Sequence, residues 1–78
     1  MESPITIDPE IQFGTPVFTG TRVPVESLFW HFESGISLDA FLEDFPSVSR
    51  AQAIAVLDLA GKALSSDKLL PLIYEIAD

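Results

Sequence analysis

The change from strand to helix falls within one stretch, Gly14-Thr15-Pro16-Val17-Phe18-Thr19-Gly20-Thr21-Arg22-Val23-Pro24. Apolar pairs flank Thr19-Gly20-Thr21, and Gly20 can supply the positive φ that a tight hairpin connection requires. Pro24 lacks an amide donor and has its φ already near the helical value, so it can occupy the first position of a helix. The stretch therefore predicts a hairpin that leads directly into a helical region.

The residues before this stretch predict a small β-arm. Ile5-Thr6-Ile7 alternates apolar and polar side chains, which is typical of a short strand, and Asp8-Pro9-Glu10 predicts a turn. Ile11 and Phe13 continue a loose period of two. A two-stranded hairpin is hardly stable alone in water, so we expect residues 1–24 to pack on the helices or on a second copy of the chain.

Two short helices are predicted next, each from apolar residues at helical spacing. The first runs from Val25 to Ser34, ends at Gly35, and buries Val25, Leu28, Phe29 and Phe32. The second begins after Ser37 as N-cap, ends at Pro46, and buries Leu38, Phe41, Leu42 and Phe45.

The longest predicted helix runs from Arg50 to Leu64, because Ser49 and Gln52 form a capping box. Apolar side chains run nearly all round it, so we expect it to be enclosed by other parts of the fold. Residues 25–65 would thus form one helical domain. The apolar segment 66–78, predicted as a short C-terminal helix, either folds back onto this domain or docks on a partner.

Composition favours a shared core. The chain has 78 residues, of which 47% are hydrophobic and six are Phe, which is too apolar for a small lone monomer, so we expect a homodimer. No apolar run approaches the roughly 18 residues of a membrane helix, and no secretion signal precedes the first strand. The sequence therefore predicts a cytoplasmic protein without membrane contact.

The acidic balance limits the classes of partner. Twelve acidic residues against four basic ones give a net charge of -8, which disfavours binding to phosphate backbones. Such a surface suits a basic protein partner, although solubility alone would also explain it.

No catalytic or metal-binding pattern is present in the sequence. Cysteine is absent, and His31 is the only histidine, which we place on the outer side of the first helix. Asp39, Glu43 and Asp44 are interpreted as a solvated helix face without a basic partner nearby. We therefore expect no enzyme activity, no cofactor and no metal.

The second and third predicted helices have the dimensions of a helix-turn-helix. In that motif the start of the second helix faces the bases, which nominates Ser47, Ser49, Arg50 and Gln52. The aliphatic third helix and the acidic helix before it speak against such a contact. Trp30 lies off the apolar face of its helix, so it either marks an interface or lies under the N-terminal arm.

The stretch from Gly14 to Val25, followed by Gly35-Ile36-Ser37 and Phe45-Pro46-Ser47-Val48, resembles the domain-of-unknown-function 433 family of small bacterial proteins. Its members resemble VapB-type antitoxins, and the likeness spans about Ile5 to Leu64. The resemblance implies a mainly α, homeodomain-like or winged-helix-like three-helix domain with a β-arm, in a dimer. It also implies a type II toxin-antitoxin pair whose toxin resembles a PIN-type ribonuclease. Two positions that are often basic in such proteins hold Thr15 and Thr19 in this sequence. Of the basic positions of the motif only Arg22 is retained.

These observations lead to a first hypothesis of a non-enzymatic, dimeric antitoxin-like protein. Its expected toxin-binding residues are Trp30 and, in the C-terminal segment, Leu69, Leu70, Leu72, Ile73, Tyr74 and Ile76. The alternative is a transcriptional regulator that binds DNA through Arg22, Ser47, Ser49, Arg50 and Gln52. A third possibility is a structural oligomerisation module.

Overall fold

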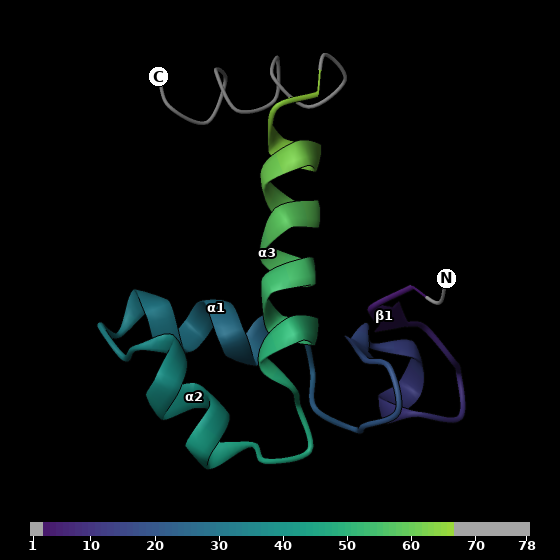
Figure 1. Cartoon of the computed structure of the whole chain (residues 1–78). Helices are drawn as coiled ribbons and strands as arrows, with labels where there is room; N and C mark the ends of the chain where they lie inside the picture. The colour runs from purple at the N-terminus through teal and green to yellow at the C-terminus, as the bar shows by residue number, and fades with distance from the viewer. Residues whose placement is uncertain (1–2, 67–78) are drawn as a thin grey trace.

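The computed structural model describes residues 3–66 of the chain, as three helices beside a small antiparallel sheet (Figure 1). The order of elements is β1 (Ile5–Thr6), the 3-10 helix η1 (Gln12–Gly14), β2 (Val17–Phe18), α1 (Glu26–Glu33), α2 (Leu38–Asp44) and α3 (Arg50–Leu64). The mainly helical architecture with an N-terminal β-arm is confirmed.

The two strands of the arm pair with each other across the intervening η1. Ile5 lies opposite Phe18, and Thr6 lies opposite Val17. The turn predicted around Gly20 is present, since Gly20 has a φ of 81° and the amide of Phe18 donates to the carbonyl of Val23 at 3.0 Å. After this turn the chain makes only an isolated bridge between Val17 and Pro24, because Pro24 has no amide hydrogen to extend the ladder.

The extended segment expected at Ile11 to Phe13 was a wrong prediction. The side-chain carboxylate of Asp8 accepts a hydrogen bond from the backbone amide of Glu10 at 2.9 Å. The backbone carbonyl of Asp8 accepts another from the backbone amide of Ile11 at 2.9 Å. This local turn starts the tight η1 connection, in which Phe13 has a φ of 57° and a side chain that is 100% exposed. The alternation of apolar residues there marks no buried face.

The helix ends follow their predicted signals closely. α1 begins at Glu26, one residue later than expected, and Gly35 follows it with a φ of 77°. The Ser37 side chain accepts from the amide of Ala40 and caps α2. The expected capping box is present at α3, whose observed bounds coincide with the predicted ones.

The core lies where the arm, α1, α2 and the first half of α3 meet. Phe41 and Phe18 are fully buried with ring centroids 6.0 Å apart, and Phe45 packs 5.0 Å from Phe41. The other core residues are Val17, Val25, Leu28, Val48, Ala53 and Val56. Phe32, expected in the core, is 37% exposed.

The expected enclosure of α3 was wrong for the residues that the structure describes. Ala53 and Val56 are buried, whereas Ile54, Leu59 and Leu64 are 50%, 44% and 55% exposed. For Leu59 and Leu64 the reason is geometric, since α3 extends well past α1, α2 and the arm (Figure 1). No helix within residues 3–66 has the length and apolar character needed to cross a membrane.

The side chain of His31 in α1 faces α2, so the prediction that it sits on the outer side of its helix was wrong. Its Nδ1 lies 2.7 Å from the carbonyl oxygen of Ser27, and its ring packs edge-on against Phe41 and Phe45 at centroid distances of 5.2 and 5.6 Å. Its Nε2 lies 3.4 Å from a carboxylate oxygen of Asp44. The histidine therefore fills a space beside the aromatic core.

Candidate functional site

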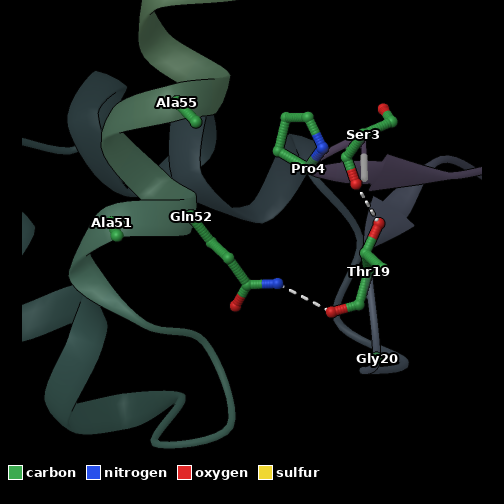
Figure 2. A pocket seen from close by; sticks show the side chains of 7 residues that line it. All are labelled: Ser3, Pro4, Thr19, Gly20, Ala51, Gln52 and Ala55. Atoms are coloured by element: carbon green, nitrogen blue, oxygen red, sulfur yellow. Dashed lines mark hydrogen bonds between the residues drawn. The ribbon is translucent and has the colours of Figure 1, made fainter. Parts of the chain in front are cut away.

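A hollow separates the N-terminal arm from the first two turns of α3 (Figure 2). Its volume is about 400 Å³, and it is lined by Ser3, Pro4, Thr19, Gly20, Ala51, Gln52 and Ala55. Ser3 and Pro4 precede β1, whereas Thr19 and Gly20 follow β2, so the antiparallel pairing brings both segments to the same edge. The small side chains of Ala51 and Ala55 leave the space open on the helix side.

Gln52 joins the two walls of this hollow. Its side-chain Nε2 donates to the carbonyl oxygen of Thr19 at 2.7 Å, and its Oε1 accepts from the backbone amide of Ser49 at 3.1 Å. The hydroxyl of Thr19 in turn donates to the carbonyl of Ser3 at 2.7 Å, as Figure 2 shows. One glutamine therefore completes the cap of α3 and also tethers the arm to the helix.

A second, wholly apolar hollow continues along α3 from the first. It has a volume of about 200 Å³ and is lined by Ile5, Val25, Phe29, Val56, Leu59, Ala60 and Ala63. Both hollows lie between α3 and the arm, since Pro4 and Ala55 line the first and the next residues along the chain, Ile5 and Val56, line the second. We call the α3 side of the two hollows the α3 strip; it consists of Ala51, Gln52, Ala55, Val56, Leu59, Ala60 and Ala63.

The α3 strip and the arm residues facing it contain no charged side chain. General acid–base chemistry needs a titratable group within reach of the substrate, and electrophilic catalysis needs a cation or a charged donor. Neither lines these hollows. Their apolar walls with a few backbone and amide groups are suited to packing against another polypeptide.

The comparisons with known proteins show the family of this chain and a solved structure of similar fold. The model of a family described as "Protein of unknown function (DUF433)" matches residues 5–60, which is most of the chain. This chain belongs to the DUF433 family. The crystal structure of a DUF433 member protein from Anabaena variabilis ATCC 29413 is similar in fold, with a TM-score of 0.65 and 23% sequence identity over 99% of this chain and 71% of that chain. No curated protein matches the chain significantly.

The DUF433 domain gathers three of the nominated DNA-contacting residues in the first turn of α3. Ser49 and Gln52 hydrogen-bond to each other as the capping box, and Arg50 pairs with Asp39 of α2. Ser47 is exposed in the connection between α2 and α3, and Arg22 is exposed in the turn after β2. The side-chain amide of Gln52 is thus already engaged within the chain.

The carboxylates of α2 have partners that the sequence did not reveal. Arg50 lies against Asp39, and His31 lies against Asp44, so the expected absence of a basic partner was wrong. The carboxylates of both contacts are largely exposed to solvent, which limits the contribution of these contacts to stability. Within residues 3–66 no group of three or more His, Asp or Glu side chains could hold a metal ion.

The outer face of α1 presents an aromatic residue between two acids. Glu26, Trp30 and Glu33 follow one another at spacings of four and three, which places them on one side of the helix. All three are exposed, Trp30 by 56%, so the alternative that Trp30 lies buried under the arm was wrong. We call this surface the α1 outer face.

The predicted partner-binding residues of the C-terminal segment, from Leu69 to Ile76, lie outside the described residues.

Sequence reasoning missed the joint role of Thr19 and Gln52, since they are 33 positions apart and no periodic pattern links them.

Proposed function

We propose that this DUF433 protein is a non-enzymatic, antitoxin-like partner of a type II pair, which binds a basic ribonuclease resembling the PIN type. The observation that carries the proposal is the α1 outer face. An exposed Trp30 flanked by Glu26 and Glu33 has the composition of a protein-binding surface, an aromatic anchor within a charged rim.

The charge of the chain supports a basic partner. At a net charge of -8 the protein attracts a cationic protein over the distance of a Debye length, and this speeds the encounter between the two. Glu43 of α2 is exposed as well, so both α1 and α2 carry exposed acidic groups. A ribonuclease that must hold RNA phosphates has the complementary charge.

DNA binding is the second candidate, supported by the exposure of Ser47 and Arg50 near the start of α3 and of Arg22 in the turn after β2. It is the weaker one, because Arg50 and Gln52 already have partners within the chain. A regulator of this kind would bind its operator with an affinity that falls as salt rises.

The test is affinity purification of the tagged full chain from its native host at moderate salt. We expect a stoichiometric basic protein whose ribonuclease activity is suppressed in the complex and returns on dissociation. Trp30→Ala should weaken this complex at least about tenfold, as removal of an aromatic anchor does. Phe13→Ala is the matched control, since it also removes an exposed ring but lies in η1.

Two results would count against this function. Recovery of the chain with DNA, in a complex that dissociates at higher salt, would favour the function of a DNA-binding transcriptional regulator. Equal binding by Trp30→Ala and the wild type would remove the α1 outer face from the interface. A chain ending at Ser66 separately tests the C-terminal segment, which we expect to contribute to toxin binding.

A further inference from the structure

The second half of α3 projects from the domain with apolar side chains exposed. After Leu57 no residue of α3 is among the buried core residues or the partly buried hydrophobic residues packed against them, and the helix continues for seven residues up to Leu64. Those residues cover about 10 Å at 1.5 Å per residue. Helical segments without tertiary packing are marginal in water, so this half of α3 needs a covering surface.

The α3 strip is the side of the helix where such a surface can dock. Its members recur at spacings of three and four residues, which keeps them on one helix face. Alanines at positions 55, 60 and 63 leave a shallow groove in which Leu59, 44% exposed, is the largest exposed side chain. The groove continues over Ile5 and Phe29, so an occupant would contact the arm and α1 as well.

The distribution of charge identifies the occupant. Beyond Leu57, α3 contains Asp58 and Lys62, a net charge of zero, whereas the rest of the chain has eleven acidic and three basic residues. Lys62 is paired with Asp58 at 3.0 Å. Two identical acidic chains therefore repel one another least where their α3 helices meet, and a basic protein is drawn to the acidic surfaces elsewhere.

We propose that the α3 strip is the interface with a second copy of this chain, with the two α3 helices packed against each other about a two-fold axis. In such an isologous contact each strip covers the other, so both projecting helices are buried at once. The alanines allow the helix axes to approach closely while Leu59 of each copy fits into the groove of the other. This interface is separate from the α1 outer face and does not depend on the proposed function.

The test compares two variants of the full chain, each of which introduces one aspartate, on a different face of α3. Leu59→Asp places a charge within the strip, whereas Ile54→Asp places one on a residue that is 50% exposed and roughly 140° away around the helix. Sedimentation equilibrium between about 1 and 100 µM measures the mass at concentrations that span a typical dimer constant. Circular dichroism checks that each variant is folded.

We expect the wild type and Ile54→Asp to have a mass close to twice the 8.5 kDa of the chain, and Leu59→Asp to dissociate about a hundredfold more readily. Should Leu59→Asp fail to fold, Ala63→Glu charges the same strip with a residue of high helix propensity and must give the same result. A monomeric wild type would overturn the proposal, since the strip would then be free for the chain's own C-terminal segment or another protein. Dissociation by Ile54→Asp but not by Leu59→Asp would also overturn it.

Discussion

The double role of Gln52 predicts that Gln52→Ala destabilises the protein beyond the loss of a helix cap. The substitution removes the bond to Thr19 and the bond from Ser49, each with a net contribution of about 1 kcal/mol. Alanine recovers about 0.4 kcal/mol through its higher helix propensity. The expected net loss is therefore about 1.5 kcal/mol, or about 6 to 12 °C in Tm for a domain of this size.

Two further variants separate the cap from the tether. Gln52→Glu keeps an oxygen that can accept from Ser49 but directs a carboxylate oxygen at the carbonyl of Thr19, so it should lose the tether alone. Ser49→Ala should lose the cap, at about 1 kcal/mol, without touching Thr19.

Urea unfolding at one fixed protein concentration measures these free energies, and hydrogen exchange shows where the loss occurs. The backbone amide of Thr19 donates to the carbonyl of Pro4. It should exchange faster than in the wild type in both Gln52 variants and at the wild-type rate in Ser49→Ala. If Gln52→Glu were as stable as the wild type and its arm equally protected, the tether would have no energetic role.

Three smaller predictions concern the core and its borders. Phe41→Ala should cost about 3 to 5 kcal/mol, because it empties a fully buried site beside Phe18, and thermal unfolding should show little or no folded protein. Gly20→Ala should lower the free energy of unfolding by about 1 kcal/mol through the positive φ of 81° alone, since apart from Gly20 and its two neighbours in the chain no residue lies within 4 Å of the new methyl group. A double-mutant cycle of His31→Ala and Asp44→Asn should give a coupling below about 1 kcal/mol, because the Asp44 side chain is 63% exposed.

The sequence predicted those features that depend on neighbouring residues. The start of α3 followed from the Ser49–Gln52 capping box, and the end of α1 followed from Gly35, which adopts a positive φ. These signals are local hydrogen bonds and backbone preferences, so they act the same way in any fold.

Features that depend on distant residues could not be predicted. Thr19 and Gln52 meet only after the arm has folded across α3, and His31 meets Asp44 only through the packing of α1 on α2. The exposure of Leu59 depends on how far α3 extends past its neighbours, which the apolar pattern of the helix does not encode. Tertiary packing decides such cases.

The most direct test of the central claim is the ribonuclease activity of whatever co-purifies with the full chain from its native host. We predict a basic, PIN-like protein whose RNA cleavage is suppressed in the complex, and whose binding weakens at least about tenfold in Trp30→Ala but not in Phe13→Ala. Recovery of the chain with only copies of itself, and no ribonuclease to inhibit, would contradict the antitoxin-like function.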